Sequence, residues 1–334
     1  MKLLTVSIAA YNVAPYLRQT LDSCVVPEIM DELEVLIVND GSIDETSNIA
    51  HEYEKRYPQT FRLFNKENGG YGTTVNLGIK EATGRYFKLL DGDDWFDKEG
   101  LKKLILELKK TSADVVITPM NKGADVNTMK ECPIDLGALN EDMSIEQMPK
   151  TNLFGMWTIT YKTEVLHNSG LKLPAHLLYT DQIFASVPWI CVKTIRFMNK
   201  AVYCYRIGRD GQSVSRESRI KHCSDSVEVN KALIRFYESD QNAKECTASE
   251  YIVRRISMYS IEVLRTFMLG EVSRENCKKV RDYDNYVKRE SPDIYTACCE
   301  LKFKMSKLLC LMRKTNYIVY YLLALVPGGM PNWG

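Results

Sequence analysis

The sequence predicts an α/β fold with a largely parallel sheet, followed by a smaller, all-helical region. Over about the first 120 residues, apolar segments of strand length alternate with segments of helical periodicity. From about residue 216, apolar residues recur three and four positions apart, as on one face of an α-helix. Strands separated by helices form βαβ units, whose sheets are covered on both faces. We therefore expect two regions, residues 1–215 and 216–334.

The alternation in the first region defines its elements. Strands are expected at 3–10, 33–38, 61–65, 84–90 and 114–119. Helices are expected at 16–25, 42–57, 73–82 and 98–111. Ser42 and Glu45 have the spacing of a capping box, in which two side chains bond backbone N–H groups at the start of a helix. We therefore begin the second helix at Ser42.

The following stretch is less regular. Residues 119–155 predict a binding loop with short elements, because passive connections are rarely that long. A strand at 156–161, a helix over 179–192 that begins near Thr180, and a β-hairpin at 195–208 come next. Helices are expected at 226–239, 248–269 and 277–290.

Residues 300–327 combine basic and apolar side chains. The basic residues are Lys302, Lys304, Lys307, Arg313 and Lys314, and the apolar run YIVYYLLALV follows. That run is well short of the roughly 20 residues that a bilayer-spanning helix needs. A basic, aromatic-rich amphipathic helix is typical of an anchor on an anionic membrane surface. A helix that packs on the protein core is the alternative.

Composition narrows the class of protein. The chain is 45% hydrophobic and 26% charged, as ordinary globular proteins are, and its net charge of +1 gives no overall field for nucleic acid. Its ten cysteines contain no C-x-x-C pair, and Lys2 leads straight into a strand without a signal peptide. We therefore expect reduced thiols and a cytoplasmic protein.

Polar side chains follow several of the predicted strands. Asn12, Asn39–Asp40, Asn65 and Asp91 all stand at or just after a strand's carboxyl end. Asn and Asp also make good turns, so one such position would mean little. Open α/β sheets bind ligands at this edge, and several polar ends together favour a site there.

The run Asp91-Gly92-Asp93-Asp94 crowds three carboxylates at the end of one strand. An EF-hand calcium loop beginning at Asp91 would need oxygen, Gly and Glu where the chain has Trp95, Phe96 and Lys102. The remaining interpretation is a divalent ion that is shared between these carboxylates and a diphosphate. Mn²⁺ and Mg²⁺ are held in this way, and such an ion relieves the repulsion between the aspartates.

Four segments together resemble the family 2 inverting glycosyltransferases of the GT-A fold. They are VSIAAYNVAPYLRQTLDS, EVLIVNDGSIDET, NGGYGTTVNLGIKEATGRYFKLLDGDDW and LLYTDQIF, in that order within residues 3–215. The later YCYRIGRDGQSVS resembles a bacterial branch that builds surface polysaccharides or teichoic acids.

The resemblance implies a role for each matching position. Asp181 would be the catalytic base, although Thr180 stands where the family more often has Glu. Asp93 would be the principal metal ligand, with Asp91 as a second contact. The expected donor-binding residues are Tyr11, Asp40, Asn68, Asn76, Asp91, Arg209, Gln212 and Ser213. The glycines of NGGYG would let the backbone approach the donor closely.

The resemblance implies an inverting glycosyltransferase that uses Mn²⁺ or Mg²⁺ and acts in cell-surface polysaccharide synthesis. It would move a sugar from a nucleoside diphosphate, with UDP expected, to a glycan or lipid-linked acceptor. We expect it at the inner membrane face, with the C-terminal helices serving membrane docking or self-association as a homo-oligomer. The alternatives are a sugar-nucleotide nucleotidyltransferase and a non-catalytic nucleotide- or glycan-binding protein of the same fold.

Overall fold

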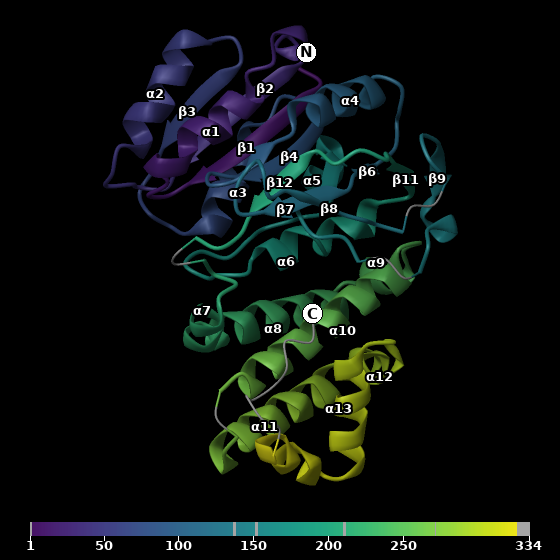
Figure 1. The fold of residues 1–334 in the computed structure, drawn as a ribbon. Helices are drawn as coiled ribbons and strands as arrows, with labels where there is room; N and C mark the ends of the chain where they lie inside the picture. The colour runs from purple at the N-terminus through teal and green to yellow at the C-terminus, as the bar shows by residue number, and fades with distance from the viewer. Residues whose placement is uncertain (1, 136–137, 151–152, 210–211, 271, 326–334) are drawn as a thin grey trace. The chain divides into compact units, whose positions relative to one another are not determined.

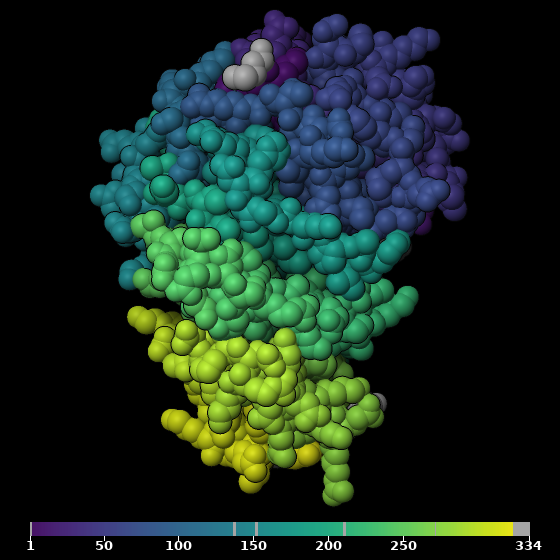
Figure 2. All heavy atoms as spheres, turned by 180° about the vertical axis from the view of Figure 1, so that it is seen from behind, coloured from purple at the N-terminus to yellow at the C-terminus, as the bar shows by residue number. Residues whose placement is uncertain are grey.

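The computed structural model describes residues 2–135, 138–150, 153–209, 212–270 and 272–325. The chain forms two compact units, Met1–Asp210 and Gly211–Gly334, divided close to the boundary expected at residue 215 (Figure 1). Figure 2 shows the side-chain surface of each unit from the opposite side.

The first unit is built on a mixed sheet with the strand order β3-β2-β1-β4-β10-β6-β11-β9. The strands are β1 Leu4–Ala10, β2 Leu33–Asn39, β3 Phe61–Asn65, β4 Tyr86–Asp91, β6 Val115–Ile117, β9 Asp142–Ser144, β10 Ile159–Lys162 and β11 Thr194–Phe197. β1 to β4 are parallel, whereas β10 is antiparallel to both β4 and β6. Every residue of β2 is buried, as expected for a parallel strand covered on both faces. The predicted α/β class is confirmed.

In the described part of the first unit, five helices follow strands. They are α1 Ala14–Cys24, α2 Thr46–Arg56, α3 Tyr71–Glu81, α4 Lys98–Leu108 and α5 Thr163–Asn168. Asp97 caps α4 by accepting a hydrogen bond from the backbone N–H of Gly100 at 2.7 Å. The capping box expected at Ser42 is wrong, because the Ser42 hydroxyl accepts instead from the N–H of Asn12 at 3.0 Å. The helix therefore begins later, at Thr46.

A second, smaller sheet has the order β5-β12-β7-β8. Its strands are β5 Trp95–Phe96, β7 Met120–Gly123, β8 Lys130–Cys132 and β12 Tyr203–Arg206. The hairpin predicted at 195–208 is wrong, because β11 pairs with β6 in the large sheet and β12 pairs with β7 in the small one. The segment with β11 and β12 runs parallel to the segment with β6 and β7, first in the large sheet and then in the small one. β11 and β12 therefore do not pair with each other as a hairpin.

The helix predicted over 179–192 is broken into two pieces. α6 covers only Asp181–Phe184, and a 3-10 helix follows at Val187–Cys191. Pro188 explains the break, since proline cannot continue a helix and disfavours the helical conformation of the residue before it. The expected loop at 119–155 contains β7, β8, β9 and a 3-10 helix at Ile145–Gln147.

The second unit is helical, as predicted. Its helices are α7 Arg216–Lys221, α8 Cys223–Ser239, α9 Gln241–Glu245, α10 Ser249–Met268, α11 Arg274–Glu290, α12 Pro292–Glu300 and α13 Lys304–Lys314, with a 3-10 helix η4 at Ile318–Leu325. In its core, the hydroxyls of Tyr283 and Ser260 both donate to Asn230 Oδ1, at 2.6 and 3.2 Å. Buried polar groups need such partners, so this cluster fixes α8, α10 and α11 together.

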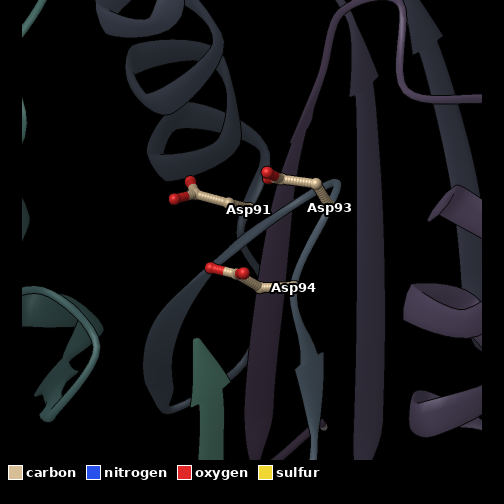
Figure 3. A group of neighbouring side chains, drawn as sticks. All are labelled: Asp91, Asp93 and Asp94. Carbon is tan, nitrogen blue, oxygen red and sulfur yellow. The ribbon is translucent and has the colours of Figure 1, made fainter. Parts of the chain in front are cut away.

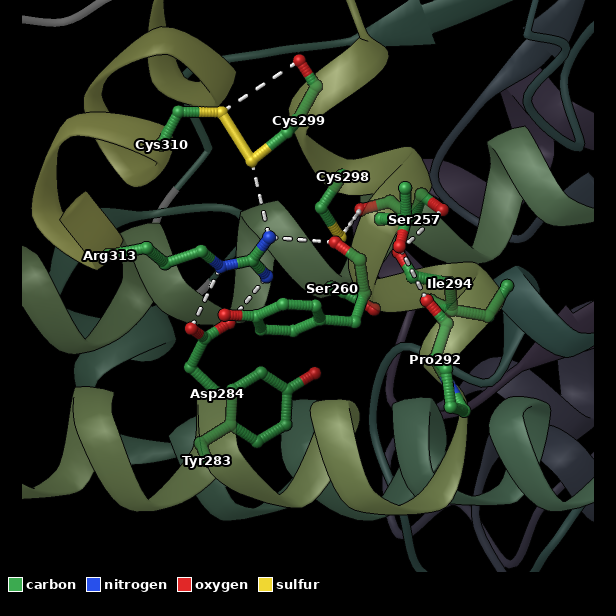
Figure 4. A network of polar contacts seen from close by, with 12 residues as sticks. Ser257, Ser260, Tyr283, Asp284, Pro292, Ile294, Cys298, Cys299, Cys310 and Arg313 are labelled. Atoms are coloured by element: carbon green, nitrogen blue, oxygen red, sulfur yellow. Dashed lines mark hydrogen bonds and ion pairs between the residues drawn. A yellow bond between two sulfur atoms is a disulfide. The ribbon is translucent and has the colours of Figure 1, made fainter.

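The placement of Arg313 corrects the exposed basic cluster expected at the C-terminal end. Its guanidinium donates twice to Asp284, at 2.9 and 2.7 Å, and its side chain is only 9% exposed (Figure 4). It also lies 3.4 Å from the ring centroid of Tyr295. Arg313 therefore packs α13 onto α11 and α12, while Lys304, Lys307 and Lys314 are exposed.

Two further expectations for this segment are changed. Cys299 and Cys310 form a disulfide, with Cα atoms 5.7 Å apart, because α12 and α13 pack together; a fully reduced set of thiols is therefore wrong (Figure 4). The segment 300–327 is two elements, α13 and η4, and not one helix, and its residues 326 and 327 lie outside the described part. Within the described residues, every helix is too short or too polar to cross a membrane.

Candidate active site

The site lies at the carboxyl edge of the parallel strands. β1 and β4 are in register with Ala9 opposite Asp91, so the ends of these central strands meet. β2 ends nearby, and Asn39 donates from Nδ2 to Asn65 Oδ1 at 2.8 Å. Asp40 follows directly. The polar residues expected at this edge therefore come from adjacent strands.

The three carboxylates of the β4 turn form a cluster. Asp91, Asp93 and Asp94 each offer an oxygen, and these oxygens lie within 4.8 Å of one another. Their carboxyl groups gather on one side of the turn (Figure 3). Oδ1 of Asp91 is buried and has no hydrogen-bond partner among the described residues. An orphaned carboxylate oxygen beside other carboxylates is a binding position for a cation.

The electrostatics of the cluster also favour a cation. Burial, with Asp93 and then Asp181 adding negative charge, raises the pKa of Asp91 to about 8. Burial, Asp91 and Asp93 likewise raise the pKa of Asp94 well above its ordinary value. Without a counter-ion these groups disfavour their charged forms. Oxygen ligands of this kind suit Mg²⁺ and Mn²⁺, so the residues fit the expected metal.

Asp94 differs from its two neighbours. It is 1% exposed and accepts hydrogen bonds from the Tyr203 hydroxyl at 2.6 Å and from the N–H of Arg206 at 2.7 Å. The Tyr203 oxygen also accepts from the N–H of Asp91 at 3.1 Å. Asp94 therefore ties the turn to β12, and the metal-ligand roles of Asp91 and Asp93 stay a prediction.

Two arginines approach the cluster from the end of β12. Arg209 forms an ion pair with the Asp93 carboxylate. Arg206 donates to the backbone carbonyl of Asp93 at 2.8 Å and to Gln19 at 2.6 Å, and it lies over the ring of Trp95. Arg206 is thus held as part of the framework, whereas Arg209 supplies positive charge to a predicted metal ligand.

Asp181 opens α6 and comes close to this cluster despite its distance along the chain. After burial and Asp93, the charge of Asp181 is the next cause that raises the pKa of Asp91. Gln182 donates from Nε2 to its carboxylate at 2.9 Å. Asp181 is therefore near enough to Asp91 to interact with it electrostatically. Its role as the base stays a prediction.

Asp40 holds the glycine-rich turn at the start of α3. Its carboxylate accepts from the N–H groups of Gly69 and Gly70 at 2.9 and 2.8 Å and forms an ion pair with Lys66. Asn68 donates from Nδ2 to the backbone carbonyl of Asp40 at 3.0 Å. Sequence reasoning missed Lys66. A nucleotide that binds at Asp40 would approach this ion pair and would interact with the Lys66 ammonium as well.

The other predicted donor residues are scattered. Tyr11 follows β1 and is 52% exposed, so its ring is accessible at the site's edge. Both polar atoms of Asn76 are engaged by Leu173. Gln212 and Ser213 belong to the second unit, and their contact with a donor stays a prediction.

Three tyrosines of the site were not predicted. Tyr203 binds Asp94, as described, and burial together with Asp94 and Asp91 raises the pKa of Tyr205 beside it. The Tyr205 ring contacts the half-buried Trp157 at a centroid distance of 5.2 Å. Burial, followed by the charges of Asp91 and Asp181, raises the pKa of Tyr71. The alternating tyrosines of YCYR were the available clue, since they share one face of a strand.

Comparison with known proteins shows similarity to glycosyltransferases. The family model "Glycosyl transferase family 2" matches residues 5–160. "Putative glycosyltransferase EpsH" of Bacillus subtilis is 29% identical over 209 residues, which cover 60% of this chain and 59% of EpsH. The "Poly(ribitol-phosphate) beta-N-acetylglucosaminyltransferase TarS" of Staphylococcus aureus is 25% identical over 217 residues, which cover 63% of this chain and 36% of TarS. The chain thus matches less than two thirds of either relative.

Solved structures share the fold. The S. aureus TarS fragment 1–349 in complex with UDP-GlcNAc aligns with a TM-score of 0.65 at 20% identity, covering 97% of this chain and 90% of that one. The mannosyltransferase PcManGT of Pyrobaculum calidifontis, in complex with GDP-Man and Mn²⁺, aligns with a TM-score of 0.54 at 15% identity, covering 97% and 87%. Residues 5–160 therefore match the glycosyl transferase family 2 model, and the chain shares the GT-A fold of these solved structures.

Proposed function

We propose that the chain is an inverting glycosyltransferase in cell-surface polysaccharide synthesis. It transfers a sugar from a nucleoside diphosphate, with UDP expected, to a hydroxyl of a glycan or lipid-linked acceptor. The observation that supports this most strongly is the cluster of Asp91, Asp93 and Asp94 at the carboxyl edge of the sheet, whose oxygens lie within 4.8 Å of one another. The charge of Asp181 also acts on Asp91, after burial and Asp93, in raising its pKa. The family match and the naming of its relatives support the same activity.

The proposed reaction is a single displacement. Asp181 accepts the proton of the acceptor hydroxyl while that oxygen forms a bond to the anomeric carbon. The bond from that carbon to the diphosphate breaks, its electron pair goes to the phosphate oxygen, and the configuration inverts. Asp181 suits this role because its carboxylate is presented at the start of α6, where Gln182 restrains it by a hydrogen bond.

Asp91 and Asp93 would hold Mn²⁺ or Mg²⁺, which would supply positive charge to the departing diphosphate. Arg209, already paired with Asp93, is the chain's own cation at this position. Asp94 keeps the turn in place through Tyr203.

A donor screen tests the activity. The purified chain is incubated with UDP-, GDP- and TDP-sugars and Mn²⁺, and release of the nucleoside diphosphate is measured. Release with a UDP-sugar is the expected result. Pyrophosphate release from UTP and a sugar phosphate would instead indicate a nucleotidyltransferase. UDP binding without turnover would indicate a binding protein.

We also propose that the protein is cytoplasmic and docks on the inner membrane face through α13 and η4. Lys304, Lys307 and Lys314 are exposed along α13, and Leu311 and Ile318 are 47% and 69% exposed. Positive charge interleaved with exposed apolar side chains fits an anionic lipid surface.

Vesicle sedimentation tests this docking. The full chain should sediment with phosphatidylglycerol vesicles but not with phosphatidylcholine vesicles, and Lys304→Glu with Lys307→Glu should abolish sedimentation. Equal sedimentation of this variant would refute the surface. A dimer that sediments with neither kind of vesicle would indicate that the surface of α13 and η4 serves self-association.

A further inference from the structure

The loop that carries Asp181 into the site is strained. Residues 171–180 form neither helix nor strand. Within them, His176 and Tyr179 have φ angles of 55° and 63°, in the left-handed region that side chains with a Cβ avoid. Each such residue costs about 1–2 kcal/mol. A loop in this conformation must be held by its surroundings.

Asn76, on α3, supplies one such anchor. Its Oδ1 accepts from the N–H of Leu173 at 2.9 Å, and its Nδ2 donates to the carbonyl of Leu173 at 2.8 Å. One side-chain amide thus pairs with both backbone groups of a single loop residue. Leu173 is itself 2% exposed, so water cannot readily replace these bonds.

The glycines at the start of α3 supply the second anchor. A Cβ on Gly72 would lie 2.3 Å from the carbonyl oxygen of Pro174, and a Cβ on Gly70 would lie 3.0 Å from the nitrogen of His176. The N–H of His176 donates to the carbonyl of Gly69 at 2.9 Å. These glycines therefore make room for the loop of Asp181.

The same turn is bound to the end of β2. The Asp40 carboxylate holds the N–H groups of Gly69 and Gly70. A continuous set of contacts therefore leads from Asp40, through the glycine turn and Asn76, to the loop that ends at Asp181. The backbone of this loop is fixed at Leu173 and at His176, before Asp181 is reached.

We propose that Asn76 is a positioning residue for Asp181: by clamping Leu173 it keeps the strained loop in the conformation that presents the base. This proposal rests on the proposed function, and it gives Asn76 a role different from donor binding. Misplacing a catalytic group by about 1 Å can lower a rate about a hundredfold.

The test is Asn76→Ala in the full-length chain. We expect kcat for transfer to fall about 10- to 100-fold, while the Kd of UDP changes less than about twofold. The control is Asn48→Ala, an exposed asparagine on α2, which should leave both values unchanged. Asn76→Asp, which keeps an acceptor for the Leu173 N–H, serves if the alanine variant does not fold, and its kcat should also fall.

A double-mutant cycle with Asp181→Asn separates positioning from general structural damage. If Asn76 acts through Asp181, Asn76→Ala should not lower the residual rate of Asp181→Asn any further. Hydrogen exchange should also show faster exchange of the Leu173 and His176 amides in the Asn76→Ala variant, a readout that does not need turnover.

Additive losses in the cycle would overturn the proposal, and so would a weaker UDP affinity with unchanged kcat. Unchanged exchange at Leu173 and His176 would overturn it as well. A wild-type chain with no transfer from any donor would instead defeat the proposed function, whatever the exchange data show.

Discussion

Replacing Lys88 by methionine should change how the stability of the first unit depends on pH. Lys88 lies in the middle of β4 and is 0% exposed. Its Nζ donates to the backbone carbonyls of Trp157 and Ile159, at 2.9 and 3.2 Å, and within the described part of the chain no carboxylate is bonded to it. Burial lowers the pKa of Lys88 from 10.5 to about 7.

The sign follows from proton binding. Between about pH 7 and the ordinary lysine pKa, the unfolded chain holds a proton that the folded protein has lost, so the free energy of unfolding rises with pH. One such proton contributes about 1.4 kcal/mol per pH unit, or about 3 kcal/mol between pH 7.5 and 9.5. Methionine has no charge to lose, so the variant lacks this rise. The carbonyls of Trp157 and Ile159 lose their hydrogen-bond donor in the variant, and this lowers the free energy of unfolding by an amount that does not vary with pH.

Urea unfolding followed by tryptophan fluorescence measures this difference, because Trp95, Trp157 and Trp189 all lie in the first unit. The control is Lys80→Met, at an exposed lysine of α3 whose side chain is 78% exposed. Its stability should run parallel to that of the wild type over the same pH range. Parallel curves for wild type and Lys88→Met would refute the reasoning.

Three further predictions concern charged groups. Arg313→Leu should lower the free energy of unfolding by about 3–5 kcal/mol, because it leaves Asp284 buried without its counter-charge; urea unfolding followed by circular dichroism measures this, and a loss below about 1 kcal/mol would contradict it. Mn²⁺ affinity, measured by electron paramagnetic resonance, should rise about tenfold per pH unit up to about pH 8, because the ion competes with the proton of Asp91; a flat profile would exclude that competition. Arg209→Gln should tighten Mn²⁺ binding without nucleotide at least about fivefold, since it removes a neighbouring positive charge; unchanged binding would mean that Arg209 and the ion do not compete.

Local periodicity was enough to predict the parallel half of the first unit. The strands β1 to β4 and the helices α1 to α4 carry their own apolar pattern, and their bounds differ little from those expected except at the start of α2. The short strand β5 was not expected. Pairing between distant segments was not readable. The hairpin at 195–208 failed because its two strands follow β6 and β7 into different sheets. The cap predicted at Ser42 is wrong because the Ser42 hydroxyl accepts a hydrogen bond from the backbone N–H of Asn12, which is far away in sequence.

The candidate site was predictable in its residue types more than in its contacts. The crowded aspartates could be read from the sequence, whereas the approach of Asp181 required the fold. The inward position of Arg313 could have been foreseen, because buried Met305, Leu309 and Met312 mark the adjacent face of α13. The hydrogen bonds between Asn76 and Leu173 could not be foreseen, because the sequence does not show which group an asparagine in a helix will bond.

The central claim is that Asp181 is the base of a sugar transfer at the Asp91–Asp93 cluster. The most direct measurement is nucleoside diphosphate release by wild type and Asp181→Asn, with the UDP-sugar that the donor screen selects, Mn²⁺ and acceptor. The account predicts that Asp181→Asn lowers release at least about a hundredfold and leaves the Kd of UDP unchanged. A variant that transfers at the wild-type rate would contradict it.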